Sequence, residues 1–221
     1  MPAERVTKQS PCHVVLVLED SNTMAGLLSH SLNEAFGEFL GVVTTLNRDE
    51  RPGILTTIIS YGSGATIWCE YASEREIERG FRLTLRGDSG ASNLGNALRT
   101  AEEALSRNPG KDSDFVPYVI IVAASASTDG VAAADFAHRV LGLQLPSGQP
   151  RVVLISLSEE IFKFQKKLAA NIPVFGLVPN ADVLVQILSA IPGILIKTSA
   201  GSREVDQNLA KLLKGDSLPL L

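Results

Sequence analysis

Acidic and hydroxyl side chains follow directly on the first long apolar run of the sequence. Residues 14–18 are all Val or Leu, and Glu19, Asp20, Ser21 and Thr23 come immediately after them. An apolar run of this length, followed by a helical pattern, predicts a buried parallel strand that ends near Glu19. Open α/β sheets hold their sites at the carboxyl ends of such strands, so these oxygens are candidate ligands for a cation or a phosphate.

The size and charge of the chain limit the kind of protein. At 221 residues it is long enough for one sizeable core, and we expect a single domain over residues 12–214 with loose tails at 1–11 and 215–221. Lys and Arg number 20 against 24 Asp and Glu, so the net charge of −4 disfavours a nucleic acid partner. The apolar runs are shorter than the about 20 residues of a membrane span, and the N-terminus is too polar for a signal peptide. We therefore expect no membrane contact and a cytoplasmic location.

Continuous apolar runs alternate with helical patterns along the chain, which predicts an α/β fold with a doubly wound, mostly parallel sheet and helices on both faces. One pair departs from this alternation, because the four residues 61–64 between two strands are too few for a helical crossover. We expect a hairpin there, with one antiparallel edge strand. The predicted strands are residues 13–18, 54–60, 65–70, 118–123, 151–157, 173–178 and 193–197, and the predicted helices are 24–46, 93–106, 131–141, 160–170, 181–190 and 204–213.

The usual signatures of catalysis are missing from the sequence. There is no G-x-S-x-G elbow, no Walker A loop and no G-x-G-x-x-G after the first strand. The two cysteines, Cys12 and Cys69, have no metal-ligand spacing and are expected to be reduced, buried thiols. We therefore expect a protein that is not an enzyme and has no cofactor.

Two families place similar residues after a first strand. Residues 15–24 (VLVLEDSNTM) resemble the opening of a response-regulator receiver domain, in which an acidic pair, here Glu19 and Asp20, holds Mg²⁺ beside a phosphorylatable aspartate. Such a domain needs that aspartate after its third strand, and residues 59–65 (ISYGSGA) contain none. A receiver-like, phosphoryl-accepting signalling domain is the alternative interpretation, and a small-ligand site at the same sheet edge is a third.

The chain more closely resembles a von Willebrand factor A (VWA) domain, in which the first strand ends in D-x-S-x-S. Glu19, Ser21 and Thr23 then occupy the three ligand positions of the metal-ion-dependent adhesion site, or MIDAS. Residues 90–98 (GASNLGNAL) resemble the G-G-T-x-x-G-x-A-L stretch of these domains, with Ser92 at the ligand threonine. The hairpin falls where VWA domains have one. Residues 119–129 (VIIVAASASTD) are similar to the TerY-like bacterial branch, which is associated with tellurite resistance.

The resemblance implies a degenerate metal site. Ala124, followed by Ser125, stands where the second ligand aspartate belongs, and it supplies neither charge nor oxygen. Losing one negative charge beside a divalent cation costs several kcal/mol, so we expect Mg²⁺ to bind weakly or not at all. Two carboxylates could compensate, Asp20 by a local twist or Asp129 by a loop shift, and Asp88 lies near Ser92 in sequence.

A simpler interpretation of the hydroxyl residues is also open. Ser21 and Thr23 could cap the first helix, and Ser92 or Asn93 the helix after it, each contributing about 1 kcal/mol. A cap and a partner-binding role are compatible. Together these features predict an interaction domain that binds another protein through residues 19–24, 88–93 and 125–130. The resemblance implies a kinase- or phosphatase-type partner in a bacterial stress-response system.

Overall fold

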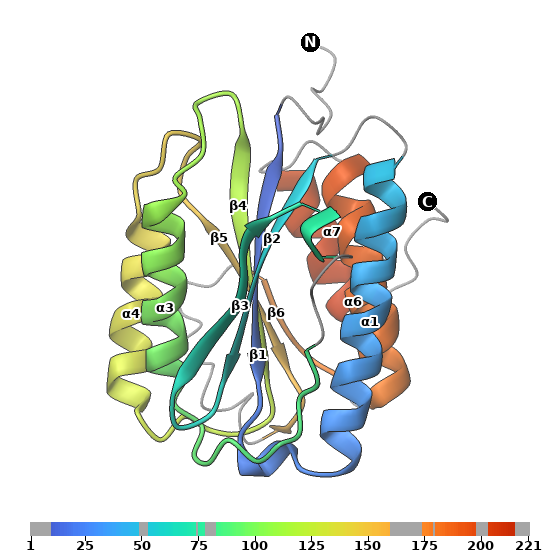
Figure 1. Ribbon diagram of the computed structural model, residues 1–221, viewed down its shortest axis with the longest axis vertical. Helices are drawn as coiled ribbons and strands as arrows, with labels where there is room; N and C mark the ends of the chain where they lie inside the picture. Colours follow the sequence, from blue (N-terminus) through green and yellow to red (C-terminus); the bar gives the residue numbers. More distant parts are fainter. Residues whose placement is uncertain are drawn as a thin grey trace.

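A mixed sheet with helices on both faces forms the protein in the computed structural model (Figure 1). The strands are β1 (Cys12–Glu19), β2 (Ile54–Tyr61), β3 (Ala65–Ala72), β4 (Phe115–Ala123), β5 (Arg151–Ser156) and β6 (Val174–Leu177). The structure describes residues 10–48, 53–73, 75–77, 83–159, 174–178, 180–197 and 203–214.

The strand order is β3-β2-β1-β4-β5-β6, and β3 pairs antiparallel with β2 while the other pairs are parallel. The predicted hairpin and antiparallel edge strand are therefore confirmed. This order differs from the 2-1-3-4-5 order of flavodoxin- and CheY-like sheets, so the topology does not support the receiver-like alternative. The carboxyl ends of all five parallel strands lie at one edge of the sheet, at the lower end in Figure 1.

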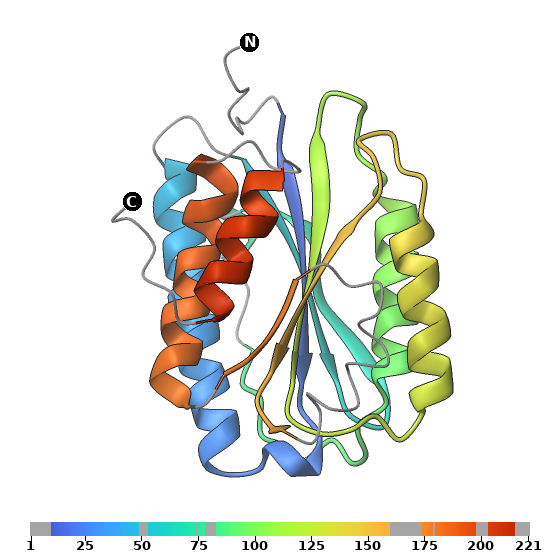
Figure 2. The same ribbon diagram turned by 180° about the vertical axis from the view of Figure 1, so that it is seen from behind.

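Two layers of helices cover the sheet, as the opposite views in Figures 1 and 2 show. One layer holds α1 (Leu27–Arg48), α6 (Ala181–Lys197) and α7 (Arg203–Leu213), and the other holds α3 (Leu94–Arg107) and α4 (Gly130–Gly142). None of the helices in the described ranges combines the length and the apolar character that a bilayer span needs.

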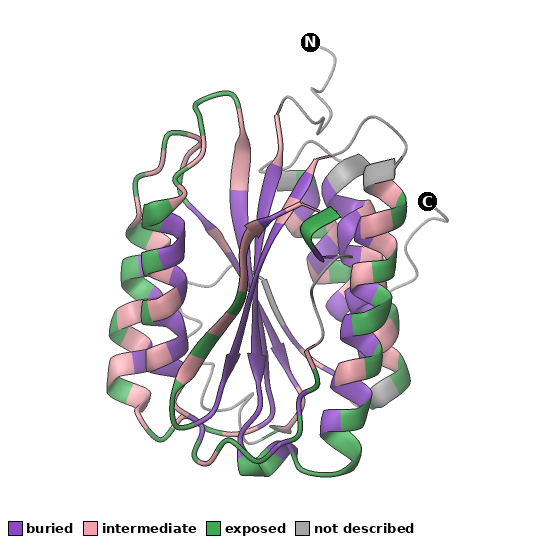
Figure 3. Ribbon diagram, in the orientation of Figure 1, coloured by how far each residue is buried: buried purple, intermediate pink, exposed green. Residues whose placement is uncertain are grey.

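The continuous apolar run of β1 is explained by burial on both faces. Val14, Leu16 and Leu18 belong to the core cluster beneath α1 and α6, whereas Val15 and Val17 belong to the cluster beneath α3 and α4. All five residues are fully buried, and the central strands form the buried centre of the molecule in Figure 3. The sheet is therefore a rigid frame that fixes where each strand ends.

The first helix begins later than the sequence predicts. Residues Asn22–Met24 form a short 3-10 turn, and Gly26 then adopts a φ of +81° before α1 starts at Leu27. A positive φ suits glycine, so the helical pattern that includes Met24 is interrupted at this point. The predicted length of about six turns is confirmed, since α1 has 22 residues.

The strand predicted at residues 193–197 is wrong, because this segment is the last part of α6. Leu184, Leu188, Ile191 and Leu195 are buried with helical spacing and join the cluster beneath α1. A short apolar run cannot by itself be assigned to strand or helix, and Pro192, which predicts a break, is accommodated inside the helix. The predicted helix at residues 160–170 lies outside the described residues.

Candidate functional site

Glu19, the last residue of β1, is the centre of the loop cluster at the carboxyl edge of the sheet. Its side chain is fully buried. Oε2 accepts hydrogen bonds from the backbone N–H groups of Ala124 at 2.6 Å and Ser125 at 3.1 Å, beyond the end of β4. Oε1 accepts hydrogen bonds from the hydroxyls of Ser21, at 2.5 Å, and Ser125. Four donors therefore compensate a charge that would otherwise be costly to bury.

Ser21 and Thr23 form a hydroxyl chain that leads from Glu19 toward the surface. Ser21 donates its single proton to Glu19, so in its 2.7 Å contact with Thr23 it must be the acceptor. Ser21 is buried and Thr23 is exposed. The Ser21 side chain makes no cap hydrogen bond to the 3-10 turn that follows it, so the capping interpretation is wrong for this residue.

Asp20 points away from this cluster and holds a different loop. Its Oδ1 accepts the N–H groups of Arg86 and Gly87, each at 2.7 Å, and its Oδ2 accepts the hydroxyl of Ser89 at 2.8 Å. Gly87 has a φ of +67°, and a Cβ there would lie 2.4 Å from the backbone nitrogen of Ala25, so only glycine fits. Asp20 is therefore committed to fastening residues 86–89 to β1 and does not replace a missing ligand.

Asp129 is also committed elsewhere, to the start of α3. The hydroxyl of Ser127 accepts the N–H of Leu94 at 3.0 Å, and Oδ1 of Asp129 accepts both the N–H of Gly95, at 3.0 Å, and the Ser127 hydroxyl. These contacts serve the first N–H groups of the helix, while Asn93 at its N-cap makes no side-chain cap bond. The helix is thus capped by a loop that comes later in the chain, which the sequence did not reveal.

Two buried hydroxyls beside Glu19 have no partner among the described residues: Ser92 Oγ and the phenol of Tyr61. Burial raises the pKa of Tyr61 well above its ordinary value, the charges of Glu19 and Asp129 raise it further, and the nearby Ser92 hydroxyl partly offsets this. The two hydroxyls lie close enough to interact electrostatically but do not complete a hydrogen bond of normal geometry. They leave donor and acceptor capacity beneath the loops that no described residue uses. Ser92 does not act as a helix cap.

Direct hydrogen bonds also join the three loops to one another. The backbone N–H of Asn22 donates to the carbonyl of Gly90 at 2.8 Å, and the N–H of Gly90 donates to Asn22 Oδ1 at 3.1 Å. The carbonyl of Ser92 accepts both the N–H of Thr128, at 2.8 Å, and its hydroxyl, at 3.1 Å. Asn22, Thr23 and Thr128 are exposed, so the joined loops present uncharged polar side chains to the solvent.

The residues present do not fit an octahedral divalent cation. Mg²⁺ prefers several oxygen ligands around at least one free carboxylate, but Glu19 already receives four donors and Ala124 offers no side-chain oxygen. Asp88 is exposed, and no described hydrogen bond joins it to Ser92. Within the described ranges, no three His, Cys, Asp or Glu side chains are grouped as metal ligands.

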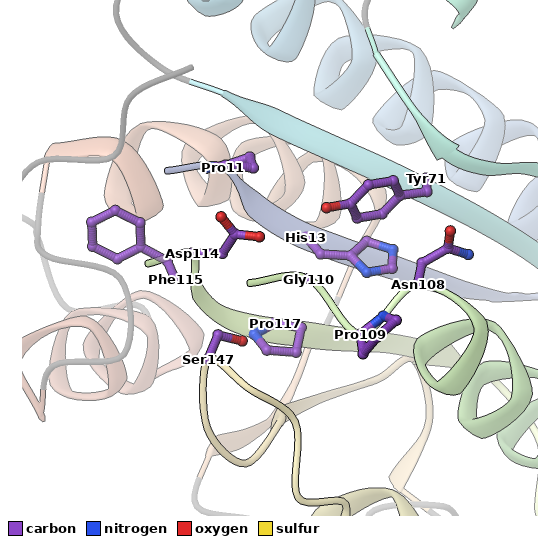
Figure 4. Close-up of a pocket in the computed structure, with 10 residues that line it drawn as sticks. All are labelled: Pro11, His13, Tyr71, Asn108, Pro109, Gly110, Asp114, Phe115, Pro117 and Ser147. Carbon is purple, nitrogen blue, oxygen red and sulfur yellow. The ribbon is translucent and has the colours of Figure 1, made fainter. Parts of the chain in front are cut away.

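A small hollow lies at the opposite edge of the sheet, near the amino ends of the parallel strands (Figure 4). His13, Tyr71, Asn108 and Asp114 line it, and its cavity volume of about 10 Å³ leaves room for about one water molecule. His13 Nε2 hydrogen-bonds Thr57 Oγ1 at 2.8 Å, whereas its Nδ1 has no partner among the described residues. The size of this hollow argues against a small-molecule site there.

Comparisons with known proteins identify the fold. The sequence matches no protein-family model and has no significant match among curated proteins. Solved structures do match. The pilus adhesin SpaC from Lactobacillus rhamnosus GG has a TM-score of 0.67 at 12% identity, over 88% of this chain and 32% of that one. A von Willebrand factor type A protein from Catenulispora acidiphila has a TM-score of 0.60 at 13% identity, over 92% and 43%.

The manganese-loaded TRAP protein of Plasmodium vivax matches with a TM-score of 0.56 at 14% identity, over 84% of this chain and 76% of that one. The chain spans less than half the length of the two bacterial proteins, so the functions of those whole proteins are not carried over with the fold. At these identities the likeness concerns the fold alone. The chain has the fold of a VWA domain.

Proposed function

We propose that this protein is a non-enzymatic interaction domain of the VWA type, which binds another protein through the carboxyl edge of its sheet. The contact surface consists of residues 19–24, 88–93 and 125–130. Support comes from the VWA fold, whose bacterial examples include a pilus adhesin, and from the exposed amide and hydroxyl groups of Asn22, Thr23 and Thr128. These groups are held in place by the hydrogen bonds that join the three loops.

We further propose that this surface is organised without a metal ion. The observation that carries this proposal is the saturated carboxylate of Glu19, which joins the loop after β1 to the loop after β4 through four hydrogen bonds. In a metallated site, a cation would hold these loops together and attract an acidic side chain of the partner. Here Glu19 does the joining, so the partner has no cation to bind.

The cellular context is part of the same proposal. The likeness of residues 119–129 to the TerY-like branch supports a role in a bacterial stress-response system, inside the cytoplasm, with a kinase- or phosphatase-type protein as the partner. A non-enzymatic role is supported by the described carboxylates at this edge, because Glu19, Asp20 and Asp129 are each engaged by neighbouring donors.

Affinity capture from the source organism, with and without chelator, tests the proposal. We expect the tagged protein to retain the same partner in EDTA and in Mg²⁺, because Glu19 already holds the loops. Thr23→Arg places a long charged side chain on the surface. It removes the contact between Thr23 and Ser21 but keeps the four hydrogen bonds to Glu19, and it should abolish capture. Quantitative mass spectrometry of the captured proteins provides the measurement.

The matched control is Ser106→Arg, which adds the same charge to an exposed residue near the far end of α3, away from this edge. It should leave capture unchanged. Equal capture by the Thr23 and Ser106 variants would remove the sheet edge from consideration. Loss of capture in EDTA alone would instead show that a metal ion organises the surface.

A further inference from the structure

Two adjacent leucines are exposed at the start of α1, beside the loop cluster. Leu27 is 76% exposed and Leu28 is 37% exposed. Among the described residues, the other large apolar side chains with comparable exposure are Trp68 and Val131. Single exposed apolar residues are common, but these two leucines are neighbours and line the same groove. Figure 3 shows this exposed start of α1 at the lower end of the molecule.

The two leucines form one wall of a groove of about 360 Å³, which we name the Leu27 groove. Its other apolar lining comes from Leu157 after β5, Val178 after β6 and Leu184 on α6. Because β5 and β6 run in the same direction as β1 in this sheet, the segments that follow them lie at the same edge as Glu19. The groove is large enough for one or two side chains of a partner.

The polar groups that line the groove are used internally, with one exception. Ser31 donates its hydroxyl to the carbonyl of Leu27 at 2.9 Å, and Asn180 Oδ1 accepts the N–H of Val183 at 3.0 Å. Asp182, exposed in the first turn of α6, has no hydrogen bond or ion pair with any described residue.

Among the described residues, the lining of the groove therefore carries one negative charge, the exposed carboxylate of Asp182, and no Lys or Arg. We propose that the Leu27 groove docks a segment of another protein that presents an aliphatic side chain next to a Lys or Arg. The aliphatic group packs between Leu27 and Leu184, and the basic group pairs with Asp182. The hydrocarbon stem of the basic residue adds to the apolar contact.

The proposed partner carries a positive charge, whereas a partner that binds a metal ion at this edge would present an acidic side chain. An acidic side chain brought into the groove would meet the carboxylate of Asp182, and the described lining offers no Lys or Arg to compensate it, which disfavours such a partner. The inference rests on the proposed function, since it assumes that this edge of the sheet is the binding surface. Beyond the proposed function, the inference states where the partner is anchored and which charge it carries.

Binding of three synthetic peptides of equal length tests the inference by fluorescence anisotropy. The first repeats Leu-Leu-Lys, the second Leu-Leu-Glu and the third Ser-Ser-Lys, so that apolar and charged contributions are separated. We expect the first to bind at least about tenfold more tightly than either of the others. Equal binding of the two Lys peptides would mean attraction to the net negative charge alone, and it would overturn the inference.

Three variants locate the binding. Leu27→Ser should weaken the binding of the Leu-Leu-Lys peptide about tenfold, and Asp182→Lys should shift the binding preference toward the Leu-Leu-Glu peptide. Val131→Ser is the matched control, because Val131 is 89% exposed in the first turn of α4 at the same sheet edge, and it should change nothing. The same loss with Val131→Ser would place the binding outside the groove.

The remaining outcomes are also decisive. If all three peptides bind more weakly than about 1 mM, the groove does not dock such a segment. A dimer that forms with increasing concentration and is lost in Leu27→Ser would assign the groove to a second copy of this chain and would equally overturn the inference. The proposed function fails separately, when Thr23→Arg leaves partner capture intact, so the two failures are distinguishable.

Discussion

At the scale of single residues, Glu19 and Ala124 form a complementary pair. The glutamate arm is one methylene longer than that of the aspartate expected from the VWA resemblance, and its Oε2 reaches the N–H of Ala124 at 2.6 Å. An aspartate at position 124 would place a second negative charge beside this buried carboxylate, and like charges at such short range disfavour ionisation of both. Alanine at position 124 and glutamate at position 19 are therefore compatible, because the longer glutamate side chain uses the space and the N–H group that an aspartate at position 124 would disturb.

A double substitution that restores both aspartates should restore metal binding. In Glu19→Asp/Ala124→Asp, the shorter arm no longer reaches the loop after β4, and two carboxylates face Ser21 and Ser92. With Mg²⁺ at about ten times its dissociation constant, we expect about 1.4 kcal/mol of stabilisation. For a protein of this size this corresponds to a rise in Tm of roughly 3–5 °C.

Differential scanning fluorimetry in EDTA and in Mg²⁺ measures the effect. The Tm of the wild-type protein should be the same in both conditions. A shift of the wild-type Tm with Mg²⁺ would contradict the metal-free organisation of the edge. Ala124→Asp alone should be less stable than wild type in EDTA, because the added charge faces Glu19.

At the scale of elements, the loop between β4 and α4 serves as the cap of α3. We predict that Asp129→Ala destabilises the protein by about 1–2 kcal/mol, the usual cost of losing an N-terminal cap. Asp129→Asn should cost less, because its carbonyl can still accept the N–H of Gly95. Urea denaturation at neutral pH measures the free energy of unfolding of each variant.

Asp135→Ala is the control for this comparison, since Asp135 is exposed on α4 and lies outside the cap. It should change the free energy of unfolding by no more than about 0.5 kcal/mol. A cost for Asp129→Ala equal to that of the control would show that the N–H groups at the start of α3 are served as well by water as by Asp129.

The elements show which parts of the fold a sequence reveals. The hairpin could be predicted because residues 61–64 are too few for any parallel connection, and the continuous apolar runs predicted a sheet buried on both faces. The end of α6 could not be predicted, because a short apolar run after Pro192 fits a strand as well as a helix. The packing of α6 against α1 decides between them, and the local sequence does not show it. Local patterns identify elements where only one connection is possible.

The candidate site was predictable in place but not in chemistry. Glu19 and Ser21, expected from the end of the first strand, and Ser92, expected from the VWA resemblance, lie on loops that hydrogen bonds join at the carboxyl edge. The partners of Glu19 were not predictable, because two of its donors are backbone N–H groups, which every residue except proline carries. Which of them a side chain reaches depends on the register between β1 and β4, and no residue type records that register.

At the scale of the whole molecule, the two edges of the sheet have different roles. The carboxyl edge carries exposed hydroxyls and the Leu27 groove, and the opposite edge buries the imidazole of His13. Burial lowers the pKa of His13 to about 4, and the charge of Glu70 only partly offsets this. The ring packs edge-on against Tyr71, with centroids 4.9 Å apart, and its burial would remove a protonated imidazole from water.

This burial makes the stability of the whole protein depend on pH. The unfolded chain has a His pKa near 6.5, so between about pH 6.5 and pH 4 the unfolded state binds the proton and the folded state does not. The stabilisation is therefore complete above about pH 6.5 and is lost as the pH falls toward 4, with a total of about 3 kcal/mol. Carboxylates also titrate toward the lower end of this range, so a variant must isolate the histidine.

His13→Gln provides that variant, because glutamine can still hydrogen-bond Thr57 but takes up no proton. We expect it to be less stable than wild type near pH 7 and to lose stability less steeply as the pH falls toward 5, as measured by urea denaturation. His30→Gln, at an exposed position on α1, should leave the wild-type slope unchanged. If the free energy of unfolding changes with pH equally steeply in wild type and His13→Gln, the protons taken up on unfolding bind to other groups. The burial of His13 would then not explain the pH dependence of stability.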